Sequence, residues 1–199
     1  QQGYVIMSFD NRGSRSPLGR TWRREAFRKI GIRPPRDQAA AVRSVLRARP
    51  WLDPERVGSW GWSGGGSMSL NAIFKFPDLY QTAIAVASVP DQRHYDTIYQ
   101  ERYMGLPTEN RKAFHDGSPI NFAQNLEGNL LLIHGAADDN CHYQTYLKLV
   151  DKLIEHNKPF SMMTYPRGTH SINEGKNARR HVYETMTRFL HEKMPPGPR

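Results

Sequence analysis

The sequence contains a single cysteine, Cys141, among 199 residues, so no disulfide can form within the chain. It also has no apolar run near the ~20 residues that a membrane-spanning helix needs. Its first residues lack the basic-then-apolar order of a secretory signal. Because the chain opens almost directly on an apolar, strand-like segment, we expect it to be part of a longer protein. Its length and its 38% hydrophobic content predict one globular domain, residues 1–199.

Negative charge is also scarce. The chain has 28 Lys and Arg residues but only 19 Asp and Glu residues, which gives a net charge of +9. Much of the excess lies between Asp10 and Asp37, where only Glu25 opposes a run of basic residues. These are Arg12, Arg15, Arg20, Arg23, Arg24, Arg28, Lys29, Arg33 and Arg36. Such a patch can bind nucleic acid or acidic lipid, but no aromatic-and-basic nucleic-acid motif accompanies it. We therefore expect a solvated surface or a contact with a neighbouring domain, and no nucleic-acid partner.

Short apolar segments alternate with segments of helical spacing. The expected strands are residues 4–9, 57–60, 84–88, 130–134 and 160–165, and the expected helices are residues 37–49, 64–76, 143–156 and 178–193. Strands that are nearly all apolar and separated by helices predict a parallel sheet covered on both faces. Residues 90–129 do not show this alternation of strand-like and helical segments clearly. We expect them to form an insertion at one end of the sheet, where it can serve as a pocket wall.

A G-x-S-x-G pattern, Gly61-Trp62-Ser63-Gly64-Gly65, follows the second expected strand and opens a helix. In a nucleophile elbow the serine occupies a strained strand-to-helix turn, and neighbours without side chains let the backbone segments approach closely. The alternative is a glycine-rich turn that holds a phosphate at a helix N-terminus. The spacing and the lysine of a P-loop are missing, so we favour the nucleophile elbow.

A serine hydroxyl needs a base to take its proton, and that base needs an acid to orient it. In this kind of fold the chain order is Ser, acid, His, with the acid and the His on loops after later strands. Residues 135–140 follow the fourth expected strand and contain Asp138 and Asp139. Residues 166–171 follow the fifth and contain His170. The order predicts His170 as the base, and both aspartates remain candidates for the acid.

The other histidines carry less weight as functional groups. His134 lies within a buried strand and is expected to be a satisfied core residue. A metal site would need the two aspartates with His142 or His170, but no H-x-x-x-H or similar ligand spacing supports it. We therefore expect no metal and no cofactor.

Three segments resemble a known family of enzymes. They are residues 60–66 (Trp-Gly-Trp-Ser-Gly-Gly-Gly), residues 100–107 (Gln-Glu-Arg-Tyr-Met-Gly-Leu-Pro) and residues 134–140 (His-Gly-Ala-Ala-Asp-Asp-Asn). They are similar to the dipeptidyl peptidase IV-like branch of the prolyl oligopeptidase family of serine peptidases, over residues 4–190. The resemblance implies an α/β-hydrolase fold that lacks its first strands.

The resemblance also implies roles for individual residues. It favours Asp138 as the acid and gives the Gly64 N–H a place in the oxyanion hole. Asn140 would bind a substrate carbonyl. The residues that would line the pocket for the residue before the cut are Tyr95, Tyr99, Val89 and Cys141.

The sequence departs from the family pattern at three positions. Gly64 and Gln92 stand where aromatic residues are usual, and Ser171 stands where glycine is usual. Strict selection of proline is therefore not expected. The second oxyanion donor of the family, a tyrosine, and its N-terminal β-propeller would lie upstream of this chain. The loss of one oxyanion donor costs ~2.7–4 kcal/mol of transition-state stabilisation, so we expect the isolated chain to be a poor enzyme.

The sequence therefore predicts a serine-type peptidase that releases N-terminal dipeptides in the full-length protein. Its expected partners are a peptide substrate and an upstream β-propeller, and homo-oligomerisation is compatible with the family. A periplasmic or cell-surface location is what the resemblance implies. The alternatives are an esterase or acylaminoacyl peptidase with the same three residues, or a homologue that serves only as an interaction domain.

Overall fold

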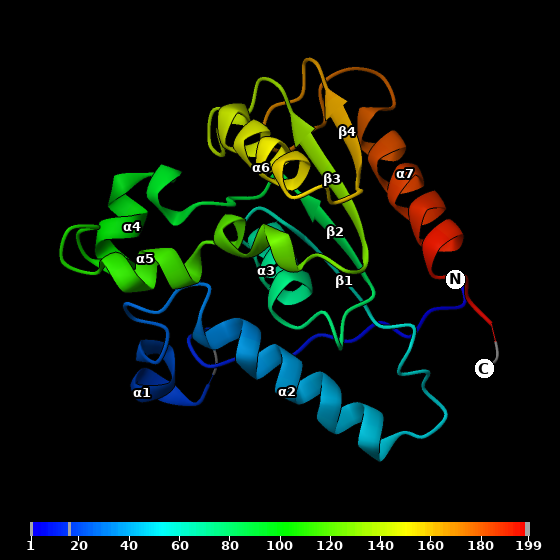
Figure 1. Ribbon diagram of the computed structural model, residues 1–199, viewed down its shortest axis with the longest axis horizontal. Coiled ribbons are helices and arrows are strands. Elements are labelled where there is room, and N and C mark those ends of the chain that lie inside the picture. The colour runs from blue at the N-terminus through cyan, green and yellow to red at the C-terminus, as the bar shows by residue number, and fades with distance from the viewer. Residues whose placement is uncertain (1, 16, 198–199) are drawn as a thin grey trace.

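The computed structural model describes residues 2–15 and 17–197 (Figure 1). Its elements in chain order are α1 (Gly19–Arg24), α2 (Arg33–Ala48), β1 (Gly58–Trp62), α3 (Gly64–Lys75), β2 (Thr82–Val86), the 3₁₀ helix η1 (Gln92–His94), α4 (Thr97–Met104), α5 (Arg111–Gly117), the 3₁₀ helix η2 (Pro119–Asn125), β3 (Asn129–Gly135), α6 (Tyr143–Glu155), β4 (Ser161–Tyr165) and α7 (Ala178–Lys193). The last four expected strands and the four expected helices are all present, with ends that differ by a few residues.

The four strands form one parallel sheet in the order β1-β2-β3-β4. Residues Thr82–Val86 of β2 pair with β1 on one side and with β3 on the other. Every residue of β2 is buried, as is every residue of β3 after Asn129. Central strands covered on both faces must be apolar nearly throughout, which explains why the apolar runs identified them.

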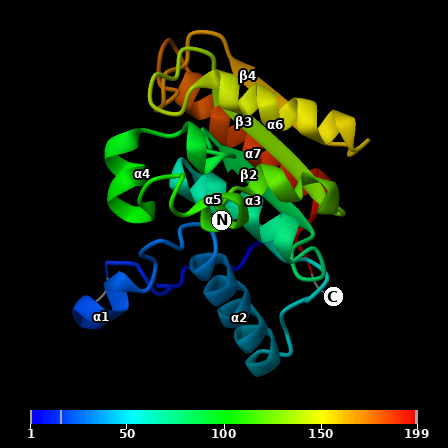
Figure 2. The ribbon, with the colours of Figure 1, turned by 60° about the vertical axis from the view of Figure 1, so that its left-hand side comes forward.

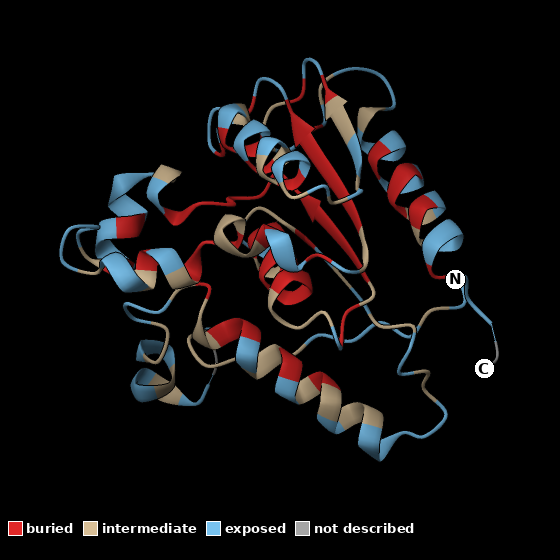
Figure 3. Cartoon of the chain, viewed as in Figure 1, coloured by how far each residue is buried: buried red, intermediate tan, exposed pale blue. Residues whose placement is uncertain are grey.

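Helices cover both faces of the sheet (Figures 1 and 2). Side chains alternate between the faces along a strand, so neighbouring residues of β2 contact different helices. Ala83 and Ala85 face α3 and α6 together with Leu130 and Leu132 of β3. Ile84, Val86, Leu131 and Ile133 face α7. In Figure 3 the buried residues accordingly follow the two inner strands and the inward sides of these helices.

The helix α2 packs on α3 instead of on the sheet. Ala39 and Val42 of α2 lie in one apolar cluster with Ala72 of α3. The helix begins at Arg33 and not at the expected Asp37, because Pro34 and Pro35 occupy its first turn. A proline there removes no intrahelical hydrogen bond, so it favours a helix start.

The expected first strand, residues 4–9, is wrong: the structure assigns no strand to it. Val5, Ile6 and Met7 are 54%, 77% and 40% exposed. A cavity of about 320 Å³ is lined both by these residues and by residues 57–60 of the β1 region. An apolar, β-branched segment favours a strand, but a strand also needs a neighbour to bond with its backbone. In the described chain β1 pairs with β2 alone, so its outer edge, with Trp60 50% exposed, borders this cavity.

The basic segment between Asp10 and Asp37 contains the short helix α1, which the sequence did not predict. Three of its arginines form ion pairs within the chain. They are Arg12 with Asp37 at 2.5 Å, Arg33 with Glu25 at 3.3 Å, and Arg28 with Glu109 at 3.6 Å. Part of the basic charge is therefore neutralised by this chain itself.

Residues 90–129 contain η1, α4, α5 and η2. Figures 1 and 2 show α4 and α5 projecting from the sheet on the same side as α1. The backbone N–H of Arg28 donates to the Tyr103 carbonyl oxygen at 2.7 Å, which joins α4 to the basic segment. These two segments together border the site described next.

Candidate active site

Ser63 occupies the turn between β1 and α3. Its backbone has φ 59° and ψ −121°, a strained conformation for a residue with a side chain. Two backbone hydrogen bonds hold it: Ser63 N donates to Val86 O at 2.8 Å, and Ser67 N donates to Ser63 O at 3.0 Å. This is the strained strand-to-helix turn that the G-x-S-x-G pattern predicted.

The first glycine of that pattern is required by close packing. A Cβ atom at Gly61 would lie 2.2 Å from the carbonyl carbon of Gly65, so any side chain would separate β1 from α3. Gly64 is different, because a Cβ atom there would meet no other atom within 4 Å. Packing therefore explains Gly61, whereas Gly64 leaves open space next to Ser63.

Asp138 and His170 lie on loops that follow the neighbouring strands β3 and β4. The carboxyl ends of these parallel strands meet at one edge of the sheet, which brings the loops together. Ala137 N donates to Gly168 O at 3.0 Å. A Cβ atom at Gly135 would lie 2.2 Å from Gly168 O, so only glycine permits this approach. The two loops are therefore packed and hydrogen-bonded as one unit.

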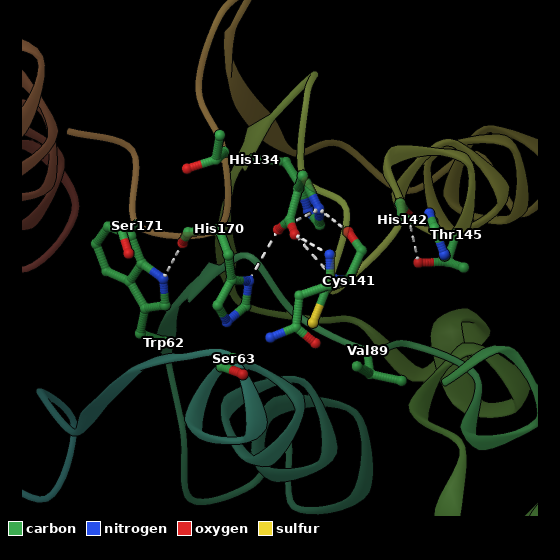
Figure 4. A network of polar contacts seen from close by, with 12 residues as sticks. Trp62, Ser63, Val89, His134, Cys141, His142, Thr145, His170 and Ser171 are labelled. Carbon is green, nitrogen blue, oxygen red and sulfur yellow. Dashed lines mark hydrogen bonds and ion pairs between the residues drawn. The ribbon is translucent and has the colours of Figure 1, made fainter. Parts of the chain in front are cut away.

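The imidazole of His170 is bonded to the Asp138 carboxylate, with 2.9 Å between Nδ1 and Oδ2. Trp62 Nε1 donates to the His170 carbonyl oxygen at 2.8 Å, and the guanidinium of Arg179 lies 4.7 Å from the centre of the Trp62 ring. In Figure 4 the side chain of His170 extends towards Ser63. Ser63 Oγ and His170 Nε2 are not hydrogen-bonded in the described structure, and in unliganded sites this contact is often long until substrate binds.

Burial raises the pKa of Asp138, but hydrogen bonds from His134, His170 and the Cys141 N–H outweigh this effect and lower the pKa to about 2. Oδ1 accepts from Asn140 N at 3.0 Å and from Cys141 N at 2.8 Å, whereas Oδ2 accepts from His170. The residue is only 4% exposed. Asp138 is therefore a buried carboxylate that its neighbours keep ionised, as an orienting acid requires.

The low pKa of Asp138 predicts a pH-dependent contribution to stability. Because the pKa falls from 3.8 in the unfolded chain to about 2 in the folded one, the contribution is complete above about pH 4. It is lost as the pH falls towards about 2, and it amounts to about 2 kcal/mol. Thermal unfolding of full-length protein between about pH 5 and about pH 2.5 should show a steeper loss for wild type than for Asp138→Asn. Parallel curves for the two proteins would contradict this assignment.

His134 is a second imidazole on Asp138 that the sequence placed only in the core. It is fully buried in β3, with Nε2 2.7 Å from Cys141 O and 3.4 Å from Asp138 Oδ2. A carbonyl oxygen can only accept a hydrogen bond, so Nε2 carries the proton. Nδ1 is buried without a partner among the described residues. The signal that could have identified it is a histidine in an otherwise apolar strand, four residues before the acid.

Asp138, Cys141 and His170 bring three possible metal-ligand atoms within 4.8 Å of one another. However, both carboxylate oxygens of Asp138 already accept hydrogen bonds. Burial raises the pKa of the Cys141 thiol to about 12, so the thiol stays protonated and is neither a good ligand nor a nucleophile. We therefore assign this group to the hydrogen-bond network around Asp138 and not to a metal site.

A cavity of about 400 Å³ opens beside Ser63. Gly64, Val89, Tyr95 and Tyr99 line it together with Ser63. The rings of Tyr95 and Tyr99 meet edge to face, with 5.4 Å between their centres, and form one wall. Both tyrosines come from residues 90–129, so this segment borders the cavity.

Asn140 and Cys141 lie at the same end of the sheet. The side chain of Asn140 is next to the Tyr95 hydroxyl, whose pKa is raised mainly by burial. The buried Cys141 thiol adjoins Ser63. All the residues that the sequence singled out for the site are therefore gathered at one edge of the sheet.

Comparison with protein families gives one decisive match. The family model described as the prolyl oligopeptidase family matches residues 1–196. The chain belongs to the prolyl oligopeptidase family. As a family member it is similar to the prolyl endopeptidase FAP of Mus musculus, with 35% identity over 195 residues that cover 96% of this chain and 25% of that protein. It is 38% identical over 190 residues to the venom dipeptidyl peptidase 4 of Vespa velutina, covering 93% of this chain and 24% of that protein.

The structure of this family member is similar to a solved one. The crystal structure of dipeptidyl peptidase 4 from Porphyromonas gingivalis matches with a TM-score of 0.88 and 37% identity, over 92% of this chain and 26% of that chain. The α/β-hydrolase fold expected from the sequence is thus confirmed. The chain spans about a quarter of the length of these relatives. Within the described residues, no helix is long and apolar enough to cross a membrane.

Proposed function

We propose that this chain is the catalytic domain, residues 1–199, of a serine peptidase that releases dipeptides from peptide N-termini in the full-length protein. Ser63 is the nucleophile, His170 the general base and Asp138 the acid that orients it. The observation that carries the proposal is the 2.9 Å contact between His170 and the buried, ionised Asp138, beside a serine on a strained elbow.

The reaction follows from this placement. His170 Nε2 takes the proton of Ser63 Oγ as that oxygen bonds to the carbonyl carbon of the substrate. The tetrahedral intermediate then collapses. Its C–N bond breaks, and His170 returns the proton to the leaving amine. Water, activated in turn by His170, hydrolyses the acyl-serine and frees the dipeptide and Ser63. Asp138 keeps its charge throughout and stabilises the imidazolium.

The negative charge that forms on the carbonyl oxygen needs hydrogen-bond donors. Gly64 is the first residue of α3, and the first N–H groups of a helix have no partner within the helix. The positive end of the helix dipole lies at the same place. The Gly64 N–H is therefore one oxyanion donor, and we propose that an upstream tyrosine of the full-length protein supplies the second.

The substrate peptide lies over the same edge of the sheet. We propose that Asn140 binds a substrate carbonyl and that Tyr95, Tyr99, Val89 and Cys141 enclose the residue before the cut. An upstream β-propeller of the full-length protein would hold the free amine of the substrate. This role is supported by the family membership and by the relatives, of which the chain spans only a quarter.

Matched substrates test the proposed reaction on full-length protein. We expect cleavage of Xaa-Ala and Xaa-Pro anilides with a free amine, and a large loss of rate when that amine is acetylated. A fluorophosphonate probe should label Ser63, because it reacts only with an activated serine. Cleavage of the acetylated substrates would indicate an acylaminoacyl peptidase, and cleavage of short acyl esters alone would indicate an esterase. Absence of both labelling and cleavage would favour the alternative that the protein serves only as an interaction domain.

A further inference from the structure

The loop that carries His170 joins β4 to α7, and the structure assigns no helix or strand to its residues 166–177. Ile172 has φ 46°, a strained conformation for a β-branched residue. Its side chain is fully buried in the cluster that faces α7, and its N–H donates to Thr169 O at 3.2 Å, which closes a turn around His170. Because strain of this kind persists only where the surrounding contacts hold the backbone, these contacts determine the position of the base.

Glu174 lies in the same loop and binds back to Thr169, the residue before His170. Thr169 N donates to Glu174 Oε2 at 2.9 Å, and the Thr169 hydroxyl donates to Oε1. Asn173 N also donates to Oε2, at 3.1 Å. The bond from the Thr169 hydroxyl is the largest of the effects that lower the pKa of Glu174, so the side chain is ionised at neutral pH. Hydrogen bonds to an ionised acceptor are stronger than those between neutral groups, so one carboxylate holds both donors of Thr169 firmly.

The contacts on the other side of the turn come from different elements. Trp62 of β1 donates to the His170 carbonyl oxygen at 2.8 Å (Figure 4). Arg179 of α7 donates to the Ser171 carbonyl oxygen, also at 2.8 Å. The turn is thus fixed from β1 and α7 after the base, and Glu174 fixes the residue before it.

We propose that Glu174 is a positioning residue that fixes the backbone before His170 and so keeps the imidazole in place for proton transfer, an inference that rests on the proposed peptidase function. Glu174 touches no reacting atom in that reaction and acts through Thr169. A displacement of a catalytic group by about 1 Å can lower a rate by about 100-fold. The loss expected here is smaller, because Trp62 and Asp138 still hold the base.

The variant Glu174→Ala tests the role in full-length protein. We expect kcat on dipeptide anilides, counted per serine that a fluorophosphonate labels at completion, to fall by about tenfold. KM should stay within about twofold, since an interaction that serves only the chemical step lowers kcat and not substrate binding. The rate of labelling should fall with kcat, because labelling also requires the base. A contribution to folding alone would reduce the number of labelled serines and leave kcat per labelled serine unchanged.

The conservative variant Glu174→Gln should restore most of the rate. Its amide oxygen can accept from Thr169 N, and its NH₂ group can donate to the Thr169 hydroxyl, which is also an acceptor. The contact then survives without the charge, and we expect kcat within about threefold of wild type. The matched control is Glu184→Ala, which removes an exposed glutamate of α7 that pairs with Arg180. That variant should keep the wild-type kcat.

A change on the other side of the contact gives a second test. Thr169→Val removes the hydroxyl donor but leaves the backbone N–H, so kcat should fall by about threefold. The double variant with Glu174→Ala should be no slower than Glu174→Ala alone, because both changes remove the same contact. If Glu174→Ala does not fold, Thr169→Val still tests the inference, and a wild-type kcat in that variant would overturn it.

The outcomes separate this inference from the function on which it rests. A wild-type kcat per labelled serine in Glu174→Ala, a loss confined to KM, a glutamine variant as slow as the alanine variant, or additive losses in the double variant would overturn the inference. Labelling of Ser63 in those cases would leave the peptidase function standing. If wild type shows neither labelling nor cleavage, both are overturned together.

Discussion

Replacing Ser63 with alanine is expected to lower kcat on dipeptide anilides by about a millionfold and to abolish labelling by a fluorophosphonate probe. The loss is this large because Ser63 Oγ forms the covalent bond of the acyl-enzyme, and the His170–Asp138 pair acts through that oxygen. The nearby Cys141 thiol cannot substitute, since burial raises its pKa to about 12. Steady-state kinetics and probe labelling of full-length protein measure both effects.

Ser171 provides a matched control for this variant. It is an exposed serine next to His170, and its backbone oxygen accepts a hydrogen bond from Arg179. Ser171→Ala should therefore keep both turnover and labelling. If Ser63→Ala retained appreciable peptidase activity, Ser63 could not be the nucleophile.

Replacing Asp138 with asparagine is expected to lower kcat by about 10⁴-fold while the protein stays folded. The amide cannot stabilise the imidazolium, and it holds His170 in the wrong tautomer. The matched control is Asp139→Asn, because Asp139 adjoins Asp138 in sequence but is exposed. That variant should differ little from wild type in kcat. Equal losses in the two variants, or a larger loss at Asp139, would refute Asp138 as the acid.

Asp138 and Asp139 also show how much of the site can be predicted from the sequence. Loop position brings Asp138 and Asp139 equally close to the edge of the sheet. The sequence pattern alone therefore left both aspartates as candidates for the acid. The structure distinguishes them by burial and by the hydrogen bond to His170. Such a distinction depends on the direction in which each side chain leaves a turn, and residue type does not encode that direction.

The elements that the sequence predicted well are those with strong local signals. The inner strands are continuous apolar runs, and α7 has a clear helical stripe that matches its observed bounds, Ala178–Lys193. The prediction of a strand over residues 4–9 was wrong, because strand formation depends on pairing with another strand that can be distant in the sequence. The part of the cavity lining that α3 supplies, Ser67 and Asn71, could not be predicted either, since both look like ordinary residues of a helix in the sequence.

The outer edge of β1 has a practical consequence for work with this chain. A strand edge with unpaired N–H and C=O groups is a template for strands of other molecules. In β1 this edge lies beside Trp60, which is half exposed and apolar. Concentrated solutions of the separate chain should consequently lose material to aggregation through this edge. Trp60→Lys, which places a charge where soluble proteins often carry one on edge strands, is the first change to make for solubility.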